Sequence, residues 1–73
     1  MLTLDKDPSG YYLVRSSTGA DRLIQFDWDF VYLAEVFGWV PSPSGDCLQT
    51  IVDARDYLDD QVGKTIDEDP GLF

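Results

Sequence analysis

Residues 26–41 read F-D-W-D-F-V-Y-L-A-E-V-F-G-W-V-P and carry the clearest helix signal in the chain. Four apolar side chains recur at i, i+3, i+4 and i+7, the spacing of one helical face; they are Phe30, Leu33, Ala34 and Phe37. Asp27 is expected to cap the start, because its carboxylate can accept from free backbone N–H groups. Gly38 and Pro41 are typical of a helix end. The pattern predicts a helix over about 28–37.

Two further contacts are expected at the ends of this helix. Phe26 and Val31 have the spacing of a hydrophobic staple, in which the residue before the cap packs on the first helical turn. Trp39 follows the terminal glycine and is expected to fold back on Ala34.

The residues before this helix have the composition of β-strands. Segments 11–15 and 22–26 are rich in aromatic and branched residues, and a polar loop with a glycine separates them. They predict an antiparallel hairpin over about 11–26. Leu2 to Leu4 is compatible with either a short strand or an ordered lead-in.

A second helix is predicted over about 49–62, after a loop rich in serine and proline, with its start expected between Asp46 and Thr50. Thr50 with Asp53 resembles a capping box, and Gly63 is the expected stop. Its inner face is expected to pack on the first helix through residues at helical spacing: Ile51, Ala54 or Arg55, Leu58 and Val62.

These elements predict a small α+β fold, with the hairpin packed on two helices. We expect one domain over 1–66 and an acidic tail over 67–73. A chain of 73 residues buries only about 60% of its unfolded surface, but its 44% apolar content supplies a rich core. The sequence contains no apolar run that approaches the ~20 residues of a membrane span. Its single cysteine, Cys47, cannot form an internal disulfide, so a cytoplasmic location is expected.

The pattern also resembles one found in small uncharacterised bacterial proteins. The matching residues are Trp28, Leu33-Ala34, Gly38-Trp39 with Pro41, and Asp53-Ala54-Arg55 with Leu58. The resemblance covers about 22–62 and departs at 42–50, which is shorter here. It implies a hairpin, a helix ending in Gly-Trp-x-Pro, a loop and a second helix, and it implies no activity.

Charge is the strongest global feature of the sequence. Fourteen acids against five bases give a net charge of −9. Residues 27–73 hold eleven of the acids and two of the bases, so the whole excess lies there (2 − 11 = −9). Such a surface repels nucleic acid and anionic membranes and favours a basic partner.

The second helix and the tail carry most of the candidate partner-binding residues, and Tyr32 lies on the first helix. We propose from the sequence that they comprise Asp53, Asp56, Asp59, Asp60, Tyr32, Tyr57, Asp67, Glu68 and Asp69. Residues three and four apart on a helix are neighbours, so the aspartates predict a row of regularly spaced negative charges. A solvated helix face, or adaptation to high salt, would give the same composition.

Catalytic and metal chemistry find little support. The chain contains no histidine, which removes Ser-His and Cys-His pairs and histidine metal ligands. Residues 5–10, D-K-D-P-S-G, match the first half of a calcium loop, but Ser16 stands where a bidentate glutamate is needed. We therefore expect no enzyme activity, no cofactor and no metal site, and read this segment as a turn.

The sequence thus predicts a non-enzymatic acidic protein that binds a basic protein surface. One form of this function is a nucleic-acid mimic that inhibits a nucleic-acid-binding partner. In size and charge the chain resembles small acidic proteins of viruses and mobile elements that block host defence nucleases. The alternatives are a homodimer-forming structural domain whose charge serves solubility, and an Asp-based metal-binding module.

Overall fold

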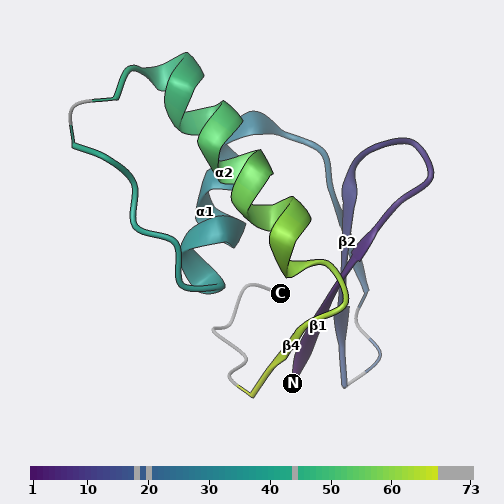
Figure 1. Cartoon of the computed structure of the whole chain (residues 1–73). Helices are drawn as coiled ribbons and strands as arrows, with labels where there is room; N and C mark the ends of the chain where they lie inside the picture. The colour runs from purple at the N-terminus through teal and green to yellow at the C-terminus, as the bar shows by residue number, and fades with distance from the viewer. Residues whose placement is uncertain (18, 20, 44, 68–73) are drawn as a thin grey trace.

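The sheet consists of four antiparallel strands in the order β3-β2-β1-β4 (Figure 1). The computed structural model describes residues 1–17, 19, 21–43 and 45–67. Its elements are β1 (Leu2–Lys6), β2 (Tyr12–Ser16), β3 (Arg22–Ile24), α1 (Asp27–Val36), α2 (Cys47–Gln61) and β4 (Thr65–Ile66). The α+β fold, with an N-terminal hairpin and two helices, is confirmed.

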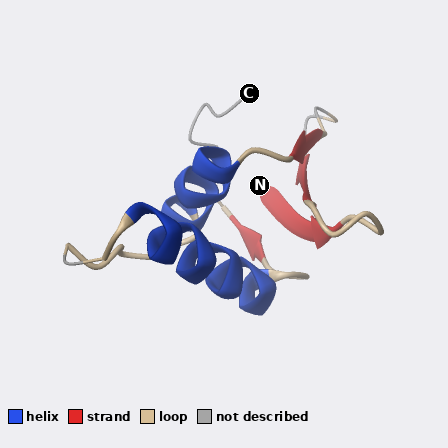
Figure 2. Cartoon of the chain, turned by 90° about the horizontal axis from the view of Figure 1, so that it is seen from above, coloured by secondary structure: helices blue, strands red, loops and turns tan. Residues whose placement is uncertain are grey.

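The two helices cover one face of the sheet, giving a two-layer arrangement (Figure 2). Side chains alternate between faces along a strand, and the inward-facing members are buried: Leu2, Leu4, Tyr12, Val14 and Ile24. The outer face carries polar pairs, such as the hydrogen bond between the Thr3 and Thr65 hydroxyls at 2.9 Å.

Two strands complete the sheet beyond the predicted hairpin. The segment at Leu2–Lys6 is a central strand, because it pairs with β2 on one side and β4 on the other. Thr65–Ile66, which the sequence did not indicate as a strand, adds to its outer edge. The backbone N–H of Gly63 donates to the Leu4 carbonyl at 2.7 Å, which guides the chain from α2 into this pairing.

The start of α1 differs from the prediction. The N-cap is Phe26, whose carbonyl accepts from the Phe30 N–H at 3.1 Å, and no side chain caps the helix. Asp27 is therefore the first helical residue, where its charge still faces the positive end of the dipole. The expected staple is also wrong, because Phe26 is 72% exposed while Val31 is buried.

The end of α1 agrees with the prediction. Gly38 has φ +101°. Its N–H donates to the backbone carbonyl of Glu35, and the Trp39 N–H donates to the backbone carbonyl of Ala34. This pair of bonds is a Schellman motif. It turns the chain so that Trp39 lies half-buried against the core.

Helix α2 starts at Cys47, within the range expected from Asp46 to Thr50, and its cap is Asp46. Asp46 accepts from the Gln49 N–H at 2.7 Å, so Thr50 lies inside the helix and the proposed Thr50–Asp53 box is wrong. Ala54 and Leu58 are the buried positions, and Gly63 follows the end with φ +88°.

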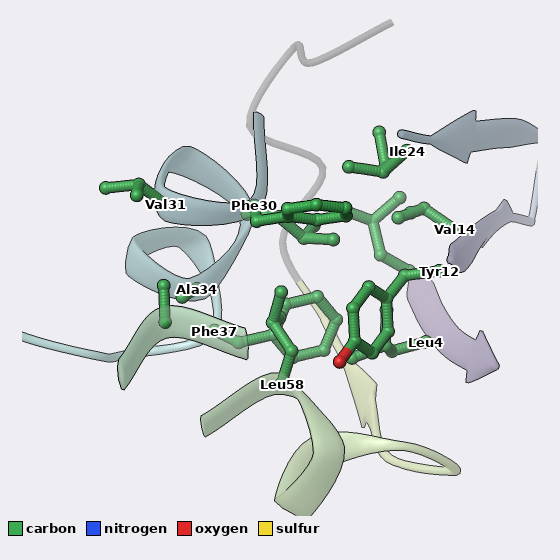
Figure 3. Close-up of a cluster of buried hydrophobic side chains, with 12 residues drawn as sticks. Leu4, Tyr12, Val14, Ile24, Phe30, Val31, Ala34, Phe37 and Leu58 are labelled. Carbon is green, nitrogen blue, oxygen red and sulfur yellow. The ribbon is translucent and has the colours of Figure 1, made fainter. Parts of the chain in front are cut away.

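The core lies between the helices and the sheet (Figure 3). Phe30 packs at its centre, with its ring edge-on to Tyr12 at 5.6 Å between centroids and stacked with Tyr11 at 6.5 Å. Aromatic pairs of this kind add about 0.5–1.5 kcal/mol beyond their buried area. All four residues of the apolar face predicted for α1 belong to this core: Phe30, Leu33, Ala34 and Phe37.

Candidate partner-binding surface

The outer face of α2 is determined by the two residues that it buries. Ala54 and Leu58 face the core, so the opposite side of the helix faces solvent. Asp53, Asp56 and Asp60 follow one another at intervals of three and four residues on that side, and Gln49 precedes them. We call Asp53, Asp56 and Asp60 the α2 acidic row.

The members of this row differ in their contacts. Asp56 and Asp60 are exposed and, within the described part of the chain, have no ion-pair partner. Asp53 is half-buried and accepts from the Gln49 side-chain amide at 2.8 Å. Two carboxylates of the row are therefore open to a partner, and the third is held in place by a neutral neighbour.

Asp59 does not belong to the row, because it faces the sheet. Its Oδ1 accepts from Lys6 Nζ at 2.7 Å and from the Tyr12 hydroxyl at 2.5 Å. The Tyr12 oxygen also lies 3.1 Å from the Arg55 carbonyl oxygen. This cluster joins β1 and β2 to α2, so the negative charge of Asp59 is already paired within the molecule.

The contacts of this cluster shift the pKa of each member. Hydrogen bonds from Lys6 and then Tyr12 lower the pKa of Asp59, since both favour the carboxylate. The hydrogen bond to Asp59 raises the pKa of Lys6. Burial raises the pKa of Tyr12, and the neighbouring Asp59 carboxylate adds to this effect.

The two tyrosines among the candidates have different environments. Tyr57 is half-buried, and its hydroxyl donates to the Phe37 carbonyl oxygen at 2.7 Å, which binds α2 to the end of α1. Tyr32 is 45% exposed on α1, where Trp28 is 60% exposed one turn earlier. Tyr57 thus joins the two helices, whereas Tyr32 is available at the surface.

The acidic tail is only partly described. Asp67 is exposed just after β4. Glu68 and Asp69 lie outside the described residues. The structure therefore places one of the three tail candidates near the end of the sheet.

In the calcium-like segment 5–10, Asp5 and Lys6 are the last residues of β1, and residues 7–10 form the turn that leads to β2. Asp7 accepts from the Ser9 N–H at 3.0 Å and from the Ser9 hydroxyl, and these bonds lower the pKa of Asp7. Asp5 pairs with Arg15 at 3.1 Å. Among the described residues, no group of three or more potential ligands could hold a metal ion.

Other features of the described region limit what the surface can do. Cys47 is a free, exposed thiol in the first turn of α2. No pocket opens among the described residues. None of their helices combines the length and apolarity needed to cross a membrane.

Sequence reasoning missed the Lys6–Asp59–Tyr12 cluster. Lys6 and Asp59 are 53 positions apart, so no local pattern relates them. The sequence did carry one local signal: Asp59 lies four residues after Arg55, so both side chains project from the side of α2 next to its buried face.

Comparison with known proteins gives no further guide to function. No protein-family model matches the chain, and neither a curated protein nor a solved structure is significantly similar to it.

Proposed function

We propose that the chain is an acidic interaction protein that binds a basic protein surface through the outer face of α2. The observation that carries this proposal is the α2 acidic row, with Asp56 and Asp60 exposed and unpaired within the described residues. Its three carboxylates extend over about 10 Å along the helix axis, at 1.5 Å per residue. This is enough to meet several basic side chains of one partner.

The placement of these charges argues against a role in helix stability. Acidic residues stabilise the N-terminal turn of a helix and destabilise the C-terminal turn, each by about 0.3–1 kcal/mol. Within α2, Asp53, Asp56 and Asp60 occupy the middle and the end, and no base lies in the last turn. A function in binding explains why charge is kept at positions where the helix gains nothing from it.

The net charge of −9 favours one kind of partner. Proteins that bind nucleic acid present clustered lysine and arginine residues, because phosphate contacts dominate their affinity. A row of carboxylates can occupy the same basic surface. We therefore propose inhibition by competition with nucleic acid as the mechanism.

Affinity capture of binding proteins from a host lysate, followed by elution with duplex DNA, tests the proposal. The immobilised wild-type chain should retain a basic protein at low ionic strength and release it to salt and to DNA. The triple variant Asp53→Lys, Asp56→Lys, Asp60→Lys should lose that protein. A protein retained by the triple variant as well as by the wild type would refute binding through α2.

A charge-matched comparison separates the row from net charge alone. Asp56→Asn with Asp60→Asn removes two charges from the row, and Asp21→Asn with Asp27→Asn removes two exposed charges elsewhere. The first pair should weaken binding to the captured protein about tenfold or more, at roughly 1.5 kcal/mol or more for the two contacts. The second pair should weaken it much less.

A homodimer is the second candidate, because several large apolar side chains are exposed: Phe26, Trp28, Val40 and Leu48. Pairing of two copies through them would have to overcome the repulsion between two chains of net charge −9. Sedimentation equilibrium decides between the two. A dimer would show twice the 8.2 kDa chain mass and keep it at high salt.

A further inference from the structure

Helix α1 presents an aromatic and acidic row to solvent. Trp28, Tyr32 and Glu35 are separated by four and three residues, so they share one side of the helix. That side is opposite to the buried residues Leu33 and Ala34. Among the described residues, none donates to, pairs with or stacks on the three side chains. We call Trp28, Tyr32 and Glu35 the α1 aromatic row.

The core does not explain these aromatic residues. The buried side of α1 already supplies Phe30, Val31, Leu33 and Ala34 to the core. Trp28 and Tyr32 keep 60% and 45% of their surface exposed, so neither belongs to the buried core. Tryptophan and tyrosine are the residues most enriched at the energetic centres of protein interfaces.

The charge of α1 restricts what can cover this row. The helix carries Asp27, Asp29 and Glu35 and no base. A second copy would place like charges against one another, and an anionic surface would be repelled for the same reason. A purely apolar partner would remove water from Glu35 without pairing its carboxylate. A cation with a flat, weakly hydrated surface fits both the exposed aromatic rings and the negative charge of this helix.

We propose that the α1 aromatic row binds an arginine side chain of the basic partner. The guanidinium group stacks on the ring of Trp28 or Tyr32 and pairs with the Glu35 carboxylate. Arginine fits better than lysine, because its planar guanidinium stacks on aromatic faces and forms two parallel bonds with a carboxylate. This inference rests on the proposed function and adds to it a preference for arginine.

Two synthetic peptides of equal length and charge test the preference, one of arginine and one of lysine residues. Calorimetric titration of the full chain at low ionic strength measures both affinities. The wild type should bind the arginine peptide about two- to fivefold more tightly for each ring that stacks. Trp28→Ala with Tyr32→Ala should reduce that ratio to near one and leave the lysine affinity almost unchanged.

Two further variants keep the test specific. Leu48→Ala removes an exposed apolar side chain from α2, so it should leave the arginine-to-lysine ratio unchanged. Trp28→Tyr keeps an aromatic face and should retain most of the preference. Circular dichroism establishes that each variant is folded, which the exposure of the substituted residues favours.

The outcomes separate this inference from the proposed function. If the wild type binds both peptides equally, or if the ratio survives loss of both rings, the arginine inference is wrong and basic binding through α2 stands. If neither peptide binds the wild type, both are wrong. Asp56→Asn with Asp60→Asn should weaken both peptides by the same factor, and a change in their ratio would contradict a separate α1 site.

Discussion

The Tyr12 hydroxyl group joins the sheet to helix α2. Its ring is buried in the core, and its oxygen points towards α2 (Figure 3). There the hydroxyl donates to the Asp59 carboxylate at 2.5 Å. Hydrogen bonds to charged acceptors are worth about 1.5–3 kcal/mol, roughly twice a neutral bond. A small change at this atom should therefore be measurable.

Tyr12→Phe should lower the free energy of unfolding by about 1–2 kcal/mol, because it removes the bond and keeps the ring. Asp59 retains Lys6 as a partner, so its carboxylate is not left unpaired. Urea denaturation measures the change. Tyr57→Phe is the matched comparison, since the Tyr57 hydroxyl donates to a neutral carbonyl. An equal or larger loss in Tyr57→Phe would contradict the special role of the charged acceptor.

Asp59→Asn should reveal a contribution to stability that depends on pH. The lowered pKa of Asp59 means that its contribution is present above about pH 4–5 and is lost as pH falls through the folded value. The raised pKa of Lys6 means that its share is present below about pH 10 and is lost as pH rises through the folded value. The difference in unfolding free energy between wild type and variant should therefore be largest between these limits.

The share of this difference that comes from the Lys6–Asp59 ion pair is limited by solvent. The side chains of Lys6 and Asp59 are 42% and 48% exposed, so the pair contributes at most about 1 kcal/mol. Denaturant titrations of both proteins between about pH 2.5 and 11 provide the measurement. A difference that stays constant through the acid range would show that the charge of Asp59 does not stabilise the fold.

At the level of elements, the sequence predicted which helices and strands exist better than it predicted where they begin and end. The stripe of Phe30, Leu33, Ala34 and Phe37 placed α1 correctly, because burial follows the helical period directly. Its start was misplaced because any of several neighbouring residues can supply the first accepting carbonyl. β4 was missed because two residues are too few to show alternation.

The cap of α2 shows why local patterns compete. Both Asp46 and Thr50 have acceptor side chains suited to an N-cap. In the structure Asp46 is the N-cap, so the helix starts at Cys47 and its first turn comprises Cys47 to Thr50. The sequence contained both signals but not the packing that extends the helix to the earlier one.

Two aspartates in α2 should affect stability in opposite directions. Asp46→Ala should lower the free energy of unfolding by about 1 kcal/mol, because the Gln49 N–H loses its acceptor. Asp60→Asn should raise it by about 0.3–1 kcal/mol, because Asp60 lies in the last turn, at the negative end of the dipole. Chemical denaturation at low salt measures both. Destabilisation by Asp60→Asn would contradict the argument that this charge is kept for binding.

At the level of the whole molecule, the exposed charges were predictable and the internal pairings were not. Helical spacing placed Asp56 and Asp60 on an outer face, and both are exposed. Asp59 and Tyr57 were grouped with them by sequence proximity. Their partners, Lys6 and the Phe37 carbonyl, lie 53 and 20 positions away, so only the fold reveals those contacts.

The net charge of −9 predicts that salt stabilises the fold while it weakens partner binding. Like charges repel one another in the folded chain, and the screening length falls from about 30 Å at 0.01 M salt to about 10 Å at 0.1 M. The two ion pairs of the described residues, Lys6–Asp59 and Arg15–Asp5, are also screened, but exposed pairs are worth at most about 1 kcal/mol each. Tm should therefore rise by several degrees between these salt concentrations.

Thermal denaturation followed by circular dichroism measures this rise, and a charge variant identifies its origin. Asp53→Asn, Asp56→Asn and Asp60→Asn together reduce the net charge to −6, since −9 + 3 = −6. The triple variant should start from a higher Tm at low salt and gain less on adding salt, because part of the repulsion has been removed. A fall in Tm with salt in the wild type would mean that the ion pairs outweigh the repulsion. The acidic row would then impose no measurable cost on folding, and its placement would lose its value as support for binding.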